Sequence, residues 1–223
     1  MRVAVIGATG GVGQQIIKHA LLQNHEVVAL VRNVEKCLQQ HEDVKDKEGL
    51  SVKKVNIFDT DSLSNELQAS DAVFCALGPT GLWNCTTMTD SIPALVKAMQ
   101  KSGVKRLVYC STWGAESRPG NPFFLEWVVK PLFIGSACKD HRRAELHIEN
   151  EAGIEYTIVR PPHLVNTPWG GQDLQIETGG MWAPGCIRGG IPRSEVAKFM
   201  LKCVTEGIHI REDVAIGLKE PTL

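Results

Sequence analysis

Seven residues near the start of the chain, GATGGVG over 7–13, place four glycines between an apolar run and an amphipathic stretch. In this context Gly7 would permit a tight turn, Gly10 would let the backbone approach a diphosphate, and Gly13 would let helix and strand pack closely. The free N–H groups and the helix dipole favour bound phosphate, so the motif predicts a dinucleotide site rather than an empty turn. The same loop supplies three more predicted cofactor contacts: Thr9, Gly11 and Val12.

The end of the second predicted strand, LVRN, indicates which dinucleotide is bound. Proteins that bind NAD usually carry a carboxylate here, which accepts a hydrogen bond from the ribose 2′-hydroxyl. This chain has Arg32 instead, and a guanidinium binds a 2′-phosphate that a carboxylate would repel. We therefore predict NADP as the cofactor, with a solvated loop charge as the alternative for Arg32.

The elements that must position these residues alternate between apolar β-rich runs and helical patterns. The pattern predicts strands at 2–7, 25–32, 50–58, 71–78, 104–112, 154–161 and 213–217. It predicts helices at 11–24, at 61–68 with Asp61 or Ser62 as the cap, at 86–102 before Gly103, at 138–153 and at 192–207. This order predicts an α/β fold, a Rossmann-type doubly wound parallel sheet with helices on both faces.

The whole chain, 1–223, is predicted to form a single NAD(P)-binding domain, since 223 residues without a repeat or linker suit one core. Two segments interrupt the alternation: 113–137, rich in proline and aromatic residues, and the looser, glycine-rich 161–191. We interpret both as substrate-side insertions over the C-terminal edge of the sheet.

Composition excludes several classes of protein. The net charge is -1 and no block of five like charges occurs, so a nucleic-acid or membrane-binding basic face is not expected. The seven cysteines are scattered without zinc spacing, which favours reduced thiols and no metal. Because the first predicted strand begins at residue 2, we expect no signal peptide before it. We expect a cytoplasmic monomer with a small-molecule partner.

Ligands of doubly wound sheets bind at the carboxyl ends of the strands. Reading those ends completes the predicted cofactor site: Asn56, Ile57, Ala76, Leu77, Gly78, Cys110, Pro162, His163 and Leu164. Pro161 and Pro162 stiffen the last of these turns. His163 is also a candidate catalytic residue, because it could donate a proton or orient a substrate, although a single histidine after a strand is often structural.

Four segments, GATGGVG, VRN, DHRRAE and GIEYTIVRPPHL, together resemble the atypical short-chain dehydrogenases/reductases. The resemblance covers nearly the whole chain. It is strongest to the NADPH-dependent flavin and biliverdin-IXβ reductases and looser to the NmrA-like redox sensors. It implies that Asn56 contacts the adenine and that Ser111 or Thr112 supplies a catalytic hydroxyl on the substrate side. A strand-end hydrogen bond to nearby backbone is the alternative for this pair.

The chain departs from that family at its catalytic pair. Most members use Tyr-x-x-x-Lys, but alignment on Gly153 places Cys138 and Arg142 at these positions, and both tyrosines fall within predicted strands. Reduction of a carbonyl to an alcohol therefore lacks its usual proton donor. A conjugated planar acceptor needs mainly a well-placed hydride donor, because solvent can supply the proton.

An aromatic-rich stretch follows the fifth predicted strand and could stack on such an acceptor. The predicted substrate contacts are Trp113, Phe123 and Trp127, with packing on the core as the alternative. We therefore expect an NADPH-dependent oxidoreductase that reduces a flavin, biliverdin or a quinone. An NADP(H)-binding redox sensor without turnover fits the missing pair equally well, and an isomerase or epimerase is a weaker third interpretation.

Overall fold

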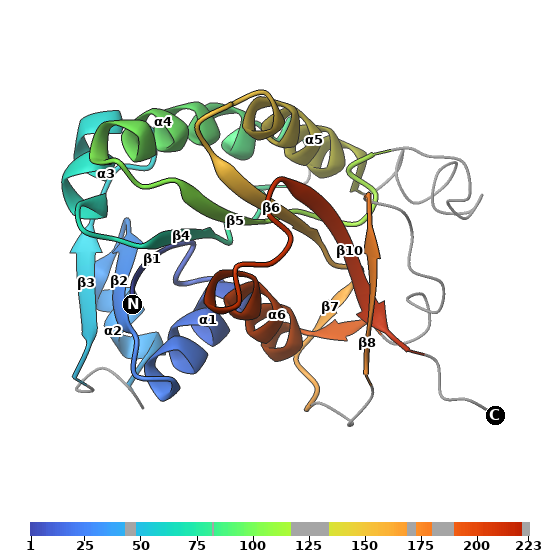
Figure 1. Ribbon diagram of the computed structural model, residues 1–223, viewed down its shortest axis with the longest axis horizontal. Coiled ribbons are helices and arrows are strands. Elements are labelled where there is room, and N and C mark those ends of the chain that lie inside the picture. Colours follow the sequence, from blue (N-terminus) through green and yellow to red (C-terminus); the bar gives the residue numbers. More distant parts are fainter. Residues whose placement is uncertain (43–47, 82, 117–133, 169–172, 180–189, 220–223) are drawn as a thin grey trace.

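The computed structural model describes residues 1–42, 48–81, 83–116, 134–168, 173–179 and 190–219. Within this part, the main sheet has eight strands in the order β3-β2-β1-β4-β5-β6-β10-β8 (Figure 1). The strands are β1 Arg2–Ile6, β2 Glu26–Val31, β3 Leu50–Lys54, β4 Ala72–Cys75, β5 Arg106–Cys110, β6 Glu155–Arg160, β8 Leu174–Thr178 and β10 Glu212–Leu218. The pairs from β3 to β10 are parallel, and β8 runs antiparallel to β10.

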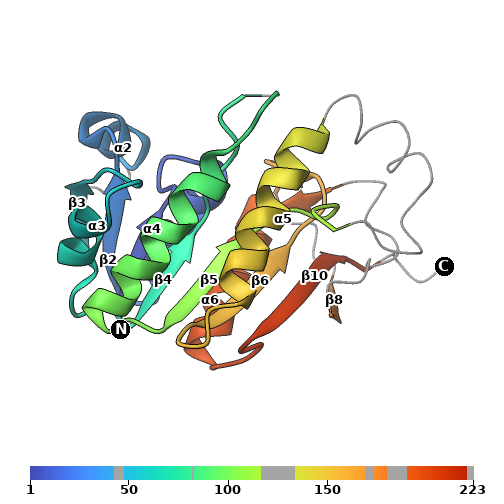
Figure 2. The ribbon, with the colours of Figure 1, turned by 90° about the horizontal axis from the view of Figure 1, so that it is seen from above.

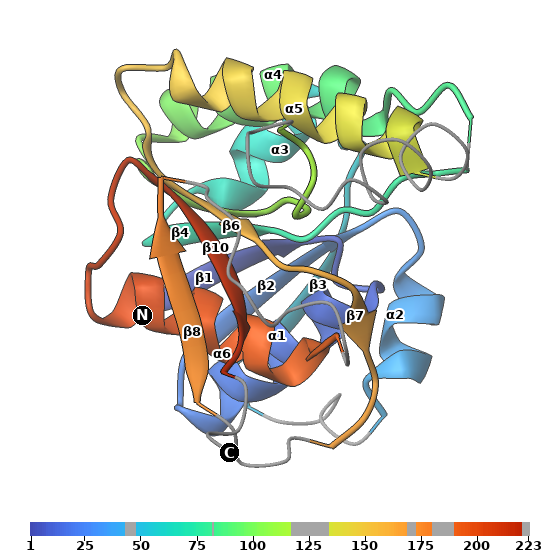
Figure 3. The same ribbon diagram turned by 90° about the vertical axis from the view of Figure 1, so that its right-hand side faces the viewer.

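Helices cover both faces of the sheet. They are α1 Gly11–Leu22, α2 Val34–Gln40, α3 Thr60–Leu67, α4 Thr87–Ser102, α5 Gly135–Glu149 and α6 Arg193–Thr205. Figure 1 and Figure 3 show α3, α4 and α5 on one face and α1, α2 and α6 on the other. The predicted doubly wound α/β fold is therefore confirmed, and the strand order reverses between β1 and β4, where such sheets open a crevice.

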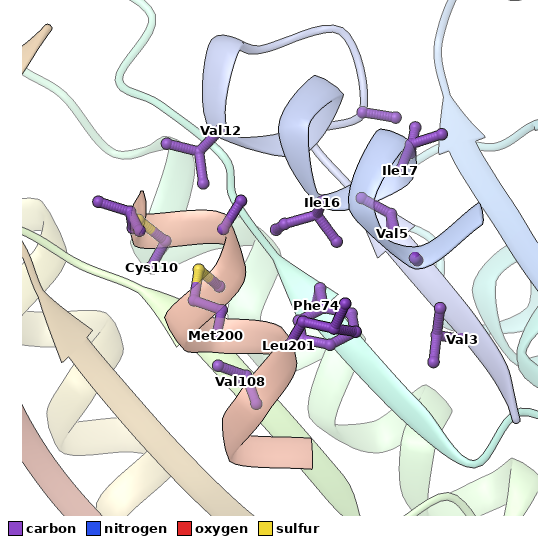
Figure 4. Packing of buried hydrophobic residues seen from close by; sticks show 14 of the residues in the cluster. Val3, Val5, Val12, Ile16, Ile17, Phe74, Val108, Cys110, Met200 and Leu201 are labelled. Carbon is purple, nitrogen blue, oxygen red and sulfur yellow. The ribbon is translucent and has the colours of Figure 1, made fainter. Parts of the chain in front are cut away.

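The core consists of two clusters, one on each face of the sheet. In β1, Val3 and Val5 belong to the cluster under α1 and α6, while Ala4 and Ile6 belong to the cluster under α3, α4 and α5. Figure 4 shows the first cluster, with Met200 of α6 among its labelled residues. Because both faces are covered, the central strands read as continuous apolar runs rather than alternating ones.

Two helix ends test the capping signals. Asp59 caps α3, since its Oδ1 accepts hydrogen bonds from the N–H groups of Asp61 at 2.9 Å and Ser62 at 3.3 Å. The predicted cap, Asp61 or Ser62, was therefore wrong, because the capping residue must precede the first helical turn. The prediction at the end of α4 is confirmed, where Gly103 has φ +78° and occupies the left-handed C-terminal position.

Five elements were missed or misjudged from the sequence. Helix α2 was not predicted, although Asn33 caps it by accepting from the Lys36 N–H at 2.7 Å. Strand β3 ends at Lys54 rather than at residue 58. Within the looser segment 161–191, β8 extends the main sheet, and β7 (Leu164–Val165) pairs with β9 (Ile191–Pro192). Residues 174–178 of this segment therefore belong to the main sheet, whereas we had interpreted the whole segment as an insertion over the C-terminal edge of the sheet.

Membrane-spanning helices, metal sites and disulfides were not expected from the sequence. Across the described ranges, no helix is long and apolar enough to cross a membrane. The same residues contain no group of three or more His, Cys, Asp or Glu side chains placed to hold a metal ion. Six cysteines in this part are buried and free of disulfides, while Cys186 lies outside the described residues.

Candidate dinucleotide and substrate site

The glycine loop turns sharply between β1 and α1. Gly7 has φ +82°, in the left-handed region, and its carbonyl accepts a hydrogen bond from the Gly10 N–H at 2.8 Å. A Cβ on Gly7 would collide with the Ala76 carbonyl, and one on Gly13 would collide with the Gly7 carbonyl. The turn predicted for Gly7 and the close packing predicted for Gly13 are therefore both present.

The start of α1 leaves its N–H groups available to a ligand. Gly10 is the N-cap residue, and no described side chain caps this helix. Two side chains brace the loop: Gln14 Nε2 donates to the Thr9 carbonyl at 3.1 Å, and Nε2 of the buried His41 lies 3.2 Å from the Ala8 carbonyl oxygen. The braced loop and the positive end of the helix dipole suit a phosphate group.

A cavity of about 220 Å³, called the first cavity below, opens beside this loop at the ends of β1, β2 and β4. Its described lining residues are 7–10, 30–32, 57, 58, 76–78, 80 and 87. Arg32 is exposed and is the one charged side chain among them. No acidic side chain of the described lining would therefore repel a 2′-phosphate here.

Asn56 has a local role. Its Oδ1 accepts a hydrogen bond from the Phe58 N–H at 3.1 Å, which forms a tight turn after β3. This turn places Ile57 and Phe58, rather than Asn56, in the lining of the first cavity. The predicted contact of Asn56 with adenine thus stays a prediction, while Phe58 was missed because an exposed phenylalanine after a strand carries no specific signal.

A second cavity, of about 380 Å³, lies at the ends of β4, β5 and β6. Its described lining residues are 10–12, 76–79, 110–112, 134, 137, 138, 141, 161, 162, 164 and 193. The two cavities share Gly10 and residues 76–78, so they adjoin each other at the strand ends, and together they are called the cleft. Figure 2 shows β4, β5 and β6 running side by side, with α4 and α5 lying across one face of them. Of these two helices, α5 supplies Ala137, Cys138 and His141 to the described lining of the second cavity.

Most predicted residues meet in this cleft, and a few do not. The His163 side chain is exposed and absent from the lining of both cavities, while its carbonyl accepts from the Ile191 N–H at 2.8 Å. The backbone N–H of Trp113 donates to the Pro161 carbonyl at 2.8 Å, and its ring is not among the described lining. Phe123 and Trp127 lie outside the described residues.

The structure separates the two candidate hydroxyls. Ser111 is buried, and its Oγ donates to Oε1 of Glu145 at 2.6 Å. Thr112 is half-buried, and among the described residues its hydroxyl has no hydrogen-bond partner. Both residues line the second cavity, so Thr112 carries the more available hydroxyl, while Ser111 is held by a carboxylate.

Behind Ser111 lies a buried ion network centred on Glu145 and Arg160. The Arg160 guanidinium binds Glu145 through Nε at 2.9 Å and Nη2 at 2.8 Å, and Nη2 also lies 3.0 Å from Asp213 Oδ2. Burial acts to lower the pKa of Arg160, but its bonds to Glu145 outweigh burial and raise it. Burial raises the pKa of Asp213 against the opposing charge of Arg160. The network links α5, β6 and β10 beneath the cavity floor.

The positions of the family's catalytic pair are occupied by groups with other roles. Cys138 is buried and lines the second cavity. Arg142, one turn later, binds Glu149 at 2.7 Å and Glu145 at 3.1 Å and does not line either cavity. Neither side chain therefore reproduces the tyrosine and lysine.

Sequence reasoning also missed two polar residues of the second cavity. His141 lies on α5 and is 5% exposed, with Nδ1 2.7 Å from the Tyr109 hydroxyl. Arg193, at the start of α6, lies beside Gly11 and donates to Asn166 at 2.7 Å. The missed signal for His141 was its place three residues after Cys138, since residues three apart share a helix face.

The chain resembles two groups of known proteins. It is 33% identical over 132 residues to the photosystem II assembly factor Ycf39 of Synechocystis, covering 55% of this chain and 37% of that protein. It is 32% identical over 182 residues to an uncharacterized chloroplastic protein of Arabidopsis thaliana, covering 75% and 60%. The chain thus spans 60% or less of the length of these two relatives.

Solved structures share the fold at lower identity. An oxidoreductase, ylbE, from Lactococcus lactis superposes with a TM-score of 0.79 at 18% identity, covering 100% of this chain and 93% of that one. A short-chain dehydrogenase/reductase from Veillonella parvula, solved in complex with NADP, gives 0.77 at 19% identity, covering 99% and 94%. A family model described as NAD(P)H-binding matches residues 7–207, and the chain belongs to this NAD(P)H-binding family.

Proposed function

We propose that the protein is an NADPH-dependent reductase that transfers hydride to a planar, conjugated acceptor such as a flavin, biliverdin-IXβ or a quinone. The observation that carries the proposal is the second cavity, which adjoins the first cavity at the ends of β4 and β5. Its volume of about 380 Å³ falls within the range typical of small-molecule sites. Its described lining contains no carboxylate and neither member of a tyrosine–lysine pair.

Arg32 supports NADPH over NADH. It stands at the end of β2, where an NAD-binding protein would usually carry an acid, and it is the one charge in the described lining of the first cavity. A ribose 2′-phosphate there would gain a charge-assisted hydrogen bond. The reduced form follows from the chemistry proposed, because the hydride must come from the cofactor.

The acceptor class follows from what the second cavity offers. Cys110, at the end of β5, is no acid near neutral pH, because burial raises the pKa of its thiol to about 12. A saturated ketone would need a strong proton donor as hydride arrives, whereas a conjugated acceptor delocalises the charge and takes its proton from solvent. A flavin, tetrapyrrole or quinone meets that requirement.

The test is the loss of NADPH absorbance when purified protein is mixed with excess FMN, riboflavin, biliverdin-IXβ or a soluble quinone. We expect turnover with at least one acceptor and slower turnover with NADH. Tight binding of NADPH without turnover of any acceptor would contradict the proposal. Denatured protein and buffer with free acceptor correct for direct reaction between acceptor and NADPH.

A second candidate is an NADP(H)-binding assembly or regulatory protein that turns nothing over. Two observations favour it: Cys138 and Arg142 replace the family's catalytic pair, and the chain is similar to a protein named as an assembly factor. The same assay separates the two candidates. A dissociation constant for NADPH below the cellular concentration, combined with no acceptor turnover, is the result expected for the second candidate.

A further inference from the structure

The second cavity contains a buried polar pair whose role the family resemblance does not supply. His141 on α5 is 5% exposed and lines the cavity, and Tyr109 on β5 is fully buried behind it. The Tyr109 hydroxyl lies 2.7 Å from His141 Nδ1, and the two ring centroids are 5.8 Å apart. A buried histidine and phenol at a reaction cleft need a reason, because burying polar groups costs free energy.

The surroundings of Tyr109 fix where the proton of His141 sits. Among the described residues, His141 is the one hydrogen-bond partner of the Tyr109 hydroxyl. If this hydroxyl accepted from Nδ1–H, its own proton would remain buried without an acceptor. The phenol therefore donates to Nδ1, and the neutral imidazole carries its proton on Nε2. Among the described residues, Nε2 makes no hydrogen bond, so it is free to donate.

Burial, and not the charges around His141, keeps the ring neutral. Burial lowers its pKa, and the opposing carboxylates Glu145 and Asp140 on the same helix do not outweigh burial. Both carboxylates have other partners: Glu145 binds Arg160, and Asp140 accepts from the Thr89 N–H at 2.8 Å and the Met88 N–H at 3.0 Å. The facing group on β5 is Tyr109, and burial raises the pKa of its hydroxyl well above the usual value.

The position of His141 suits a role in the reaction. It follows Cys138 by three residues, and residues at this spacing lie on one face of a helix. Cys138 stands where relatives carry the catalytic tyrosine, and both side chains line the same cavity. His141 therefore presents a hydrogen-bond donor next to the place where the family's donor is missing.

Resting on the reductase function proposed above, we propose that His141 is a catalytic hydrogen-bond donor and that Tyr109 positions it. The Nε2–H donates to the carbonyl oxygen or ring nitrogen of the acceptor that gains negative charge as hydride arrives. NADPH loses the hydride, with its two electrons, and becomes NADP⁺. The reduced acceptor takes one proton from water, and His141 keeps its own. The acceptor is thus a conjugated system that places a carbonyl oxygen or ring nitrogen within hydrogen-bond distance of His141 Nε2.

Three variants test the proposal. His141→Met removes the donor, and we expect kcat to fall about 100-fold, as for other single donors to a developing negative charge. His141→Gln retains an amide N–H near the Nε2 position, and we expect it to keep kcat within about tenfold of wild type. Tyr109→Phe frees the imidazole to change tautomer, and we expect an intermediate loss in kcat with little change in KM.

The controls separate chemistry from folding. His147→Gln, on the same helix but outside the second cavity, is expected to retain wild-type kcat. The NADPH dissociation constant of all variants should stay within about threefold of wild type, because neither His141 nor Tyr109 lines the first cavity. Equal kcat in His141→Met and His141→Gln, or in His141→Met and wild type, would overturn the proposal.

A measurement on the unsubstituted protein decides the case even where a variant fails to fold. In ¹⁵N spectra of histidine-labelled protein, His141 is expected as the Nε2–H tautomer, and the Nδ1–H tautomer would overturn the proposal. If wild-type protein binds NADPH but reduces no acceptor, the proposed reductase function is wrong, and the role proposed for His141 is wrong as well. If wild-type protein reduces an acceptor and the His141 variants have the same kcat, only the role proposed for His141 is wrong.

Discussion

The two cavities of the cleft are built in different ways. The first cavity is bounded by the glycine loop and the ends of β1, β2 and β4, and its described lining ends at residue 87. The second draws on α1, β4, β5, α5, β6 and α6, from residue 10 to residue 193. Local backbone geometry and one cation define the first, whereas side chains from distant segments define the second.

This difference explains how one family can share a cofactor and differ in chemistry. A phosphate needs N–H groups and a positive charge, which a short loop and a strand end supply. An acceptor needs donors placed to fit its shape, which depends on how α5 packs on β5 and β6. In this protein that packing rests on the buried ions of Glu145 and Arg160.

Breaking those ions should have the largest effect and should fall on the second cavity. Glu145→Gln removes the buried charge that Arg160 and Ser111 contact, and we expect the free energy of unfolding to fall by about 3 kcal/mol. Denaturant unfolding measures it. Glu149→Gln is the matched control on the same helix, because the partly exposed Glu149–Arg142 pair should contribute less than about 1 kcal/mol. Equal losses would contradict the network's importance.

A substitution in the glycine loop at Gly7, which lines the first cavity only, should damage that cavity. In Gly7→Ala the new Cβ meets the Ala76 carbonyl at a backbone φ of +82°, so the loop must shift. We expect the NADPH dissociation constant, measured by fluorescence titration, to rise about 100-fold, equivalent to about 2.7 kcal/mol. Gly153→Ala, whose Cβ would enter open space, should leave binding unchanged. Unchanged binding in Gly7→Ala would show that the loop tolerates a shift.

The charge of the first cavity can be inverted without touching the second. Arg32→Asp should weaken NADPH binding at least about tenfold, through loss of a charged hydrogen bond to the 2′-phosphate, and leave NADH binding nearly unchanged. Lys36→Asp makes the same change in charge nearby, outside the described lining of the first cavity, and should affect NADPH less. An Arg32→Asp variant that keeps its preference for NADPH would show that the assignment of Arg32 is wrong.

Acidification should lower the stability of the folded protein through His141 of the second cavity. Because burial lowers the pKa of His141, the unfolded chain binds a proton on this ring at a higher pH than the folded protein does. The corresponding stability is fully present above pH 6.5 and is lost as the pH falls through the lower, folded-state pKa. Melting temperatures between pH 7.5 and pH 5, about one unit or more either side of the ordinary histidine pKa, should fall more steeply for wild type than for His141→Gln. Parallel curves would contradict this prediction.

The smallest effect is expected at His163. Its side chain is exposed and outside the described lining of both cavities, so His163→Ala should change kcat/KM by less than about twofold. Thr112→Val, which removes the available hydroxyl of the second cavity, should have the larger effect on the same acceptor assay. A larger loss of kcat/KM in His163→Ala than in Thr112→Val would indicate that His163 is a catalytic residue after all.

Much of the fold was predictable, and the misses share a cause. Continuous apolar runs identified the central strands, because both of their faces are covered. Strand β8 was missed because its sequence, LQIET, alternates between apolar and polar residues over only five positions, within a glycine-rich segment that we interpreted as an insertion. Helix α2 was missed because seven residues carry too little periodicity, although Asn33 gave a capping signal.

The sequence by itself determined the dinucleotide loop and the charge beside it. Gly7 and Gly13 act through neighbouring backbone, so their roles can be read from residue type and order. The role proposed for Arg32 was read in the same way, from its place at a strand end. Only the tertiary structure decided which hydroxyl is free, that His141 lines the second cavity, and that Glu145 holds Ser111 and Arg160. These contacts join residues 15 to 34 positions apart, and helical periodicity does not fix which side chains meet when α5 packs on the sheet.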